Sequence, residues 1–139
     1  MRVLFVLFVV CALSGCEPVD FIKRSGVSLL DRVRAVDTLR LNAAAFSEGD
    51  IDTMEATMHP DAPSTVDAQA LFDRYAPKMD ISDVKFVSES SGAVVFEYSQ
   101  MIQSTRATLP ATSARVRTEL RRMPKGWGIV SSDVLSLSR

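Results

Sequence analysis

Apolar side chains recur every three or four positions between Ser28 and Gly49, which is the period of one face of an α-helix. The apolar positions of this stripe are Leu29, Val33, Val36, Leu39, Ala43 and Phe46. Ser28 and Asp31 form a capping-box-like start, and Gly49 suits the left-handed conformation in which many helices end. The pattern therefore predicts one long helix that begins at Ser28, ends at Gly49 and carries a single apolar stripe.

Two shorter helices are predicted next. Asp50 caps the first, whose apolar side is Ile51, Met54 and Met58. Pro60 ends this helix, because the residue before a proline avoids the α conformation. After a loop or extended segment over residues 62–65, the third helix covers residues 66–75 and ends at Pro77, with its apolar side formed by Ala68, Leu71, Phe72 and Tyr75.

From residue 84 onward the apolar period changes from 3.6 to 2, which predicts β-strands. The expected strands cover residues 84–87, 94–102, 115–121 and 127–137, with tight turns at residues 90–92 and 124–126. Consecutive strands joined by short turns pair antiparallel. Helices followed by such strands indicate an α+β domain in which the helices cover one face of the sheet.

The N-terminus has a different pattern. Val3 to Leu13 is an unbroken apolar run of eleven residues, preceded by Arg2. Such a run is too short for a membrane-spanning helix, which needs roughly 20 residues, but it is typical of a secretory signal peptide. The run ends in Leu13-Ser14-Gly15-Cys16, which resembles the lipobox of bacterial lipoproteins. That resemblance implies cleavage before Cys16 and a diacylglycerol on its thiol.

The expected organisation is a signal peptide over residues 1–15, a lipidated tether over 16–27 and one folded domain over 28–139. The tether either touches the membrane interface or packs on the domain with Phe21, Ile22, Lys23 and Arg24. The expected location is the bacterial cell envelope. Because Glu17 is not the Asp associated with inner-membrane retention, the resemblance favours the periplasmic face of the outer membrane.

Three short motifs in the folded region occur in a recognisable order. They are Phe46 to Asp52, Met58-His59-Pro60-Asp61-Ala62 and Gly126-Trp127-Gly128-Ile129. In this order they resemble the nuclear transport factor 2-like superfamily, which includes polyketide-cyclase-like and ketosteroid-isomerase-like proteins. The resemblance covers roughly residues 28–138. It implies a curved antiparallel sheet wrapped around the helices, with a cone-shaped cavity between them.

The steroid-isomerase members of that superfamily use a Tyr at the position where this chain has Asn42. Their general-base Asp falls near Val66, one position from Asp67. Because a shift of one residue in a strand turns a side chain to the opposite face, isomerase chemistry does not carry over. Asn42, Tyr75, Tyr98 and Trp127 are the candidates to line a cavity, and the three aromatic residues are alternatively ordinary core residues.

Composition excludes several classes of protein. Lys plus Arg is 16 and Asp plus Glu is 17, so the basic excess of a general nucleic-acid binder is absent. One His and two Cys exclude a multi-ligand His/Cys metal cluster and a disulfide scaffold, and no cofactor is expected. The acidic residues Asp50, Asp52, Glu55 and Asp61 either form a metal site or act at helix ends. Their spacing matches no calcium loop, and helix capping explains the first three.

His59, the single histidine, is either a general acid/base at the cavity mouth or a partly solvated residue at the negative end of a helix. No Ser or Cys nucleophile has a recognisable partner motif, which favours the second role. Four arginines form a basic edge that either meets an anionic partner or faces solvent: Arg115, Arg117, Arg121 and Arg122.

The leading hypothesis is a lipid-anchored envelope protein whose domain binds a small apolar ligand or a partner protein without catalysis. A small cofactor-free isomerase, cyclase or hydrolase that uses His59 or Asp67 is the second hypothesis. A structural subunit of an envelope assembly, with the outer sheet face as its interface, is the third. A homodimer is compatible with each of them. Fold alone does not choose among these, because function depends on particular sites.

Overall fold

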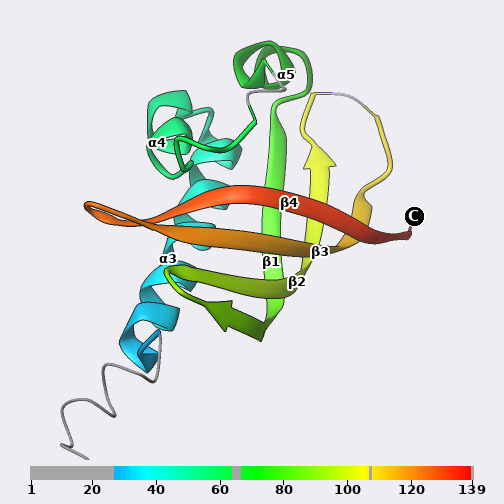
Figure 1. Cartoon of the computed structure of the whole chain (residues 1–139). Helices are drawn as coiled ribbons and strands as arrows, with labels where there is room; N and C mark the ends of the chain where they lie inside the picture. Colours follow the sequence, from blue (N-terminus) through cyan, green and yellow to red (C-terminus); the bar gives the residue numbers. More distant parts are fainter. Residues whose placement is uncertain (1–26, 64–66, 107, 139) are drawn as a thin grey trace, which may run out of the picture.

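The computed structural model describes residues 27–63, 67–106 and 108–138 (Figure 1). Three helices come first: α3 (Leu29–Glu48), α4 (Ile51–Ala56) and α5 (Ala68–Tyr75). Four strands follow: β1 (Pro77–Ser90), β2 (Ala93–Ser104), β3 (Thr112–Met123) and β4 (Gly126–Ser138). The predicted α+β class, with helices first and an antiparallel sheet second, is confirmed. The predicted signal peptide, Cys16, Phe21 to Arg24 and Val66 lie outside the described residues.

The sheet is a meander with strand order β1-β2-β3-β4, and every neighbouring pair is antiparallel. Across the sheet Phe96 lies opposite both Phe86 and Thr118, and Tyr98 lies opposite Val116. β1 begins at Pro77, seven residues before the alternation that predicted it. Its early part was missed because shifts of register between Ser82 and Lys85 break the period of two, and because this edge strand is mostly exposed.

The ends of α3 match the sequence pattern. The Ser28 hydroxyl accepts a hydrogen bond from the backbone N–H of Asp31 at 3.1 Å and donates one to its carboxylate at 2.9 Å. Gly49 ends the helix with a left-handed φ of 72°. A Cβ at Gly49 would lie only 2.5 Å from the Phe72 ring of α5, so this position also needs glycine for space.

The predicted apolar stripe of α3 is wrong at its first two positions. Leu29 is 76% exposed and Val33 is 50% exposed, whereas the buried residues are Ala35, Leu39, Ala43 and Ala45. The helix faces the sheet through small side chains, which allow its backbone to lie close to the strands. The face predicted from the large apolar residues is therefore rotated about the helix axis relative to the face that is buried.

α4 ends at Ala56, before Pro60 is reached. Residues 57–59 leave the helix and pair with β4 in a short parallel bridge. The N–H of His59 donates to the carbonyl of Ile129 at 2.9 Å, and the N–H of Ile129 donates to the carbonyl of Thr57 at 2.9 Å. The prediction that Pro60 sets the end of this helix is wrong, because pairing with β4 takes the chain out of the helix earlier.

The hydrophobic core lies between α3 and the inner face of the sheet. Its members are Val27, Ala35, Leu39, Val94, Phe96, Tyr98, Val116, Leu120, Trp127 and Ile129. Val27, the last residue of the predicted tether, is 4% exposed and belongs to this packed unit. Among the described residues, no helix is both long enough and apolar enough to cross a membrane.

Candidate ligand-binding pocket

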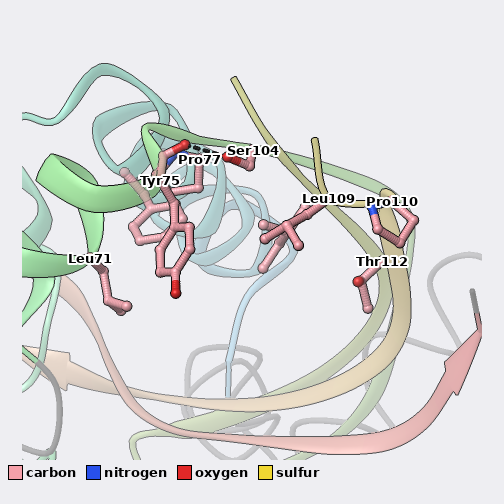
Figure 2. Close-up of a pocket in the computed structure, with 9 residues that line it drawn as sticks. Leu71, Tyr75, Pro77, Ser104, Leu109, Pro110 and Thr112 are labelled. Carbon is pink, nitrogen blue, oxygen red and sulfur yellow. Dashed lines mark hydrogen bonds between the residues drawn. The ribbon is translucent and has the colours of Figure 1, made fainter. Parts of the chain in front are cut away.

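A pocket of about 530 Å³ opens at the end of the sheet where α5 lies (Figure 2). It is bounded by α5, the start of β1, the end of β2 and the segment that leads into β3. Figure 2 shows Leu71 and Leu109 on opposite sides of this space, above the curved strands. The lining residues are Phe46, Leu71, Tyr75, Pro77, Ile102, Ser104, Leu109, Pro110 and Thr112.

The lining is apolar with a few hydroxyl groups. Of the nine described residues that line the pocket, none is Asp, Glu, His, Lys, Arg or Cys. The phenol oxygen of Tyr75 points toward the strands in Figure 2, while the Ser104 hydroxyl donates to the Tyr75 backbone carbonyl at 2.6 Å. A volume of this size with apolar walls and few polar groups is typical of a site for a small organic molecule.

The C-terminal end of α5 is held against the end of β2. Ala76 leaves the helix with a left-handed φ of 39°, and its N–H donates to the Phe72 carbonyl at 2.7 Å. The Thr105 hydroxyl donates to the Ala76 carbonyl at 2.8 Å. The Thr105 N–H also donates to the Tyr75 carbonyl at 3.3 Å, so the rim beside Tyr75 is fixed by backbone contacts.

Only one of the four residues expected to line a cavity, Tyr75, lines this pocket. Tyr98 is buried in the core, where its hydroxyl lies 3.0 Å from that of Thr118. The Asn42 amide donates to the Thr57 hydroxyl at 2.7 Å and thus joins α3 to the end of α4. The structure does not bring these side chains together, because the core and the joint between the two helices satisfy their polar groups separately.

Trp127 borders a second, more polar pocket of about 330 Å³ between α3 and the β3–β4 turn. Its lining residues are Arg34, Asp37, Thr38, Leu41, Ala56, Thr57, Met123, Lys125, Gly126 and Trp127. The guanidinium of Arg122 lies 4.9 Å over the Trp127 ring, which is otherwise buried in the core.

Neither acid/base candidate lines either pocket. The Nδ1 atom of His59 accepts the N–H of Asp61 at 3.1 Å, and its side chain is 15% exposed. Asp67 is exposed and caps α5 by accepting the N–H of Ala70 at 3.0 Å. Both side chains therefore have a local structural role outside the apolar pocket.

The arginines of the predicted basic edge are paired with acidic side chains. Their nearest carboxylates belong to Asp83 for Arg115 (3.0 Å), Glu97 for Arg117 (2.5 Å), Glu119 for Arg121 (2.8 Å) and Asp31 for Arg122 (3.2 Å). The positive charge of this edge is thus balanced locally. Pairs of this kind at an exposed surface contribute little to stability, about 0–1 kcal/mol each.

The acidic residues after α3 act at helix ends. Asp50 caps α4, and hydrogen bonds from the Thr53 hydroxyl and the Thr53 N–H lower the pKa of its carboxyl below 3.8. Within the described ranges, no group of three or more His, Cys, Asp or Glu side chains is placed to hold a metal ion. The candidate site is therefore the apolar pocket and not the acidic segment.

Sequence reasoning missed most of the pocket. Leu109 and Pro110 lie in a segment for which the pattern predicts no element, and Ile102 was placed only as the end of a strand. These residues line the pocket because the end of β2 and the segment before β3 lie beside α5. No local period in the sequence marks such a meeting of distant segments.

Similar arrangements of helices on a curved sheet occur in solved structures. A protein of unknown function with a cystatin-like fold from Nostoc punctiforme matches with a TM-score of 0.66 and 14% identity, covering 78% of this chain and 92% of that chain. A nuclear transport factor 2-like protein with a cystatin-like fold from Novosphingobium aromaticivorans matches with a TM-score of 0.64 and 14% identity, covering 85% and 88%. A nuclear transport factor 2-like protein from Cytophaga hutchinsonii matches with a TM-score of 0.59 and 18% identity, covering 77% and 97%.

The fold is thus of the nuclear transport factor 2-like, or cystatin-like, class, as the sequence motifs predicted. Residues 37–139 match the family model described as the C-terminal domain of the anti-sigma-I factor RsgI9, and the chain belongs to this family. No curated protein matches the sequence.

Proposed function

We propose that this chain is a lipid-anchored protein of the bacterial cell envelope whose domain binds a small apolar ligand without catalysis. The observation that carries this proposal is the pocket of about 530 Å³, whose described lining residues include no acid, base or thiol of the usual catalytic kinds. Binding in an apolar pocket needs burial of apolar surface and a few oriented polar groups, and the pocket offers both.

The ligand we expect is uncharged and compact, with one or two polar atoms. The hydroxyls of Tyr75 and Thr112 are the polar groups available to orient it, while Leu71, Ile102 and Leu109 contact its apolar surface. A charged group would lose its hydration without gaining a partner among the described lining residues, which costs several kcal/mol. This selects against ionised molecules.

The family is named for a domain of an anti-sigma-I factor. A regulator acts by binding and not by catalysis. The family name is therefore consistent with a domain that binds a ligand without converting it. A partner protein that inserts an apolar side chain into the same pocket is the other occupant compatible with this role.

The anchor in this proposal is the lipid on Cys16, which follows the apolar run Val3 to Leu13. Two or three acyl chains hold a protein stably on a bilayer, whereas one chain gives only marginal binding. We expect labelled palmitate to enter the wild-type chain and not a Cys16→Ser variant, with the protein on the periplasmic face of the outer membrane. Incorporation that survives Cys16→Ser would contradict the anchor.

Ligand binding is tested with the neutral fluorescent probe N-phenyl-1-naphthylamine and two matched variants of β3. Thr112→Phe places a ring in the pocket, whereas Ser113→Phe places the same ring on the opposite face of the strand, because successive side chains alternate. We expect Thr112→Phe to weaken probe binding at least about tenfold, or about 1.4 kcal/mol, with Ser113→Phe close to wild type. Equal binding by both variants would contradict the pocket.

The non-catalytic part of the proposal has its own test. His59 is the single histidine of the chain and lies outside both pockets. A turnover of any small substrate that His59→Ala abolishes, while the fold stays intact by circular dichroism, would show that the domain is an enzyme.

A further inference from the structure

α3 buries mostly small side chains and leaves several large apolar side chains exposed. Three of its four buried residues are alanines, Ala35, Ala43 and Ala45. Four of its large apolar residues, Leu29, Leu30, Val33 and Leu41, are each at least half exposed, whereas Leu39 is buried. Contiguous exposed apolar residues mark interaction surfaces more often than chance placement. The exposed apolar face of α3 is therefore a candidate interaction surface.

Three of these residues lie together in the first two turns, Leu29, Leu30 and Val33, which we call the α3 tip. Figure 1 shows that this end of α3 points away from α4 and α5, and thus away from the apolar pocket. The α3 tip is also the part of the described helix that is nearest in sequence to Cys16, which lies 13 positions before Leu29.

Two of the charged residues beside the α3 tip pair with side chains of the sheet. Asp31 pairs with Arg122 at 3.2 Å, and Arg32 pairs with Glu89 at 3.2 Å. The Arg32 guanidinium also lies 3.8 Å from the centre of the Phe86 ring. These contacts hold the Asp31 and Arg32 side chains against the sheet and leave the apolar side chains of the α3 tip exposed.

We propose that the α3 tip inserts into the surface of the bilayer to which the chain is anchored. This rests on the lipid anchor of the proposed function. Thirteen residues reach at most about 47 Å, so the lipid keeps the α3 tip close to the bilayer. Contact then becomes an intramolecular step at high effective concentration, where a small apolar surface is enough.

Two consequences follow for this orientation. Arg34, exposed one turn into the helix, comes near the headgroups, where a positive charge favours anionic lipid. The apolar pocket at the α5 end faces away from the bilayer, open to ligands or partners from the aqueous side. The lipid and the α3 tip together set the orientation of the domain, whereas a tether alone leaves it free to rotate.

The test uses the lipidated mature chain in vesicles of phosphatidylethanolamine and phosphatidylglycerol at 3:1, with nitroxide-labelled lipid as quencher. A bimane fluorophore is attached in Leu30→Cys, or in the control Leu135→Cys on β4 near the C-terminus. Both positions are exposed leucines. We expect quenching at position 30 to exceed that at position 135 several-fold. Equal quenching at the two positions would overturn the proposal.

Failure of the anchor is distinguished by mass spectrometry of the same samples. A mature chain without lipid on Cys16 would overturn the anchor and the bilayer contact together. A lipidated chain whose label at position 30 stays in water would overturn the contact alone. In the absence of vesicles, the bimane at position 30 could become more protected from water as the protein concentration rises. That result would show that the α3 tip contacts a second copy of the chain, and it would also overturn the proposal.

Discussion

Gly128 lies against the backbone of His59 so closely that a Cβ atom at position 128 would sit 2.8 Å from both the N and the Cα of His59. This close approach occurs beside the parallel bridge in which His59 and Thr57 pair with Ile129. The bridge joins the end of the helical half to the last strand of the sheet. Position 128 of the Gly-Trp-Gly-Ile motif therefore requires glycine, because a Cβ atom would clash with the His59 backbone.

Gly128→Ala should push residues 57–59 away from β4 and destabilise the domain by about 1–3 kcal/mol, the usual cost of overpacking. Urea denaturation measures the free energy of unfolding, and hydrogen exchange should show faster exchange at the N–H groups of His59 and Ile129. Gly92→Ala is the control, since that turn glycine has φ +73° but no atom within 4 Å of an added Cβ. Unchanged exchange at His59 in Gly128→Ala would contradict the steric role.

Tyr98 and Thr118 share a hydrogen bond of 3.0 Å inside the core, and the Thr118 hydroxyl also lies 2.8 Å from that of Ser132. Tyr98→Phe removes one partner and should cost about 0.5–1.5 kcal/mol of stability. In the double variant Tyr98→Phe with Thr118→Val, both polar groups are gone. We expect the combined loss to be smaller than the sum of the single losses, as measured by a double-mutant cycle in urea. Strict additivity would show that the two hydroxyls do not interact.

Acid should weaken the domain through its two helix-start carboxylates. The Ser28 hydroxyl and Arg122 lower the pKa of Asp31, and Thr53 lowers the pKa of Asp50, each relative to 3.8. A pKa that is lower in the folded state gives stability that is present above 3.8 and is lost as the pH falls through the lowered value. Thermal midpoints measured from pH 6 to pH 2 should therefore fall most steeply below about pH 4. Asp31→Asn with Asp50→Asn should flatten this fall.

The partners of Asp31 can be ranked by the pKa of its carboxyl, followed by NMR titration. The hydrogen bond from Ser28 is the largest cause of the lowering, and the bond and charge of Arg122 act in the same direction. We expect Ser28→Ala to raise this pKa more than Arg122→Gln does, with both above wild type. A larger rise in Arg122→Gln would mean that the ion pair at 3.2 Å dominates.

The sequence predicted those parts of the fold that depend on local chemistry. The Ser28 cap, the glycine at the end of α3, the Asp50 cap and the turn at Gly92 each follow from what a few neighbouring residues can do. The alternation of Val116, Thr118 and Leu120 likewise predicted the buried face of β3, because side-chain direction in a strand has a period of two.

Features that depend on distant segments were not predictable in this way. The length of α4 is decided by pairing with β4, and the buried face of α3 is decided by how closely its alanines allow the helix to approach the sheet. The pocket forms where α5, the end of β2 and the segment around Leu109 meet. Of the residues expected in a cavity, Tyr75 lines the pocket; it was a candidate because it is an aromatic residue on the apolar side of a predicted helix, a local property.

The meander order of the sheet has a consequence for how the chain folds. Each strand pairs with its neighbour in sequence, so the three hairpins can form one after another by closing short loops. The bridge between Met58 and Ile129 joins segments that are far apart in the chain and must wait until β4 is in place. We therefore expect the strand pairs to form early in folding and the helices to dock on the sheet last. In a cell, the sheet would be ready before the pocket exists.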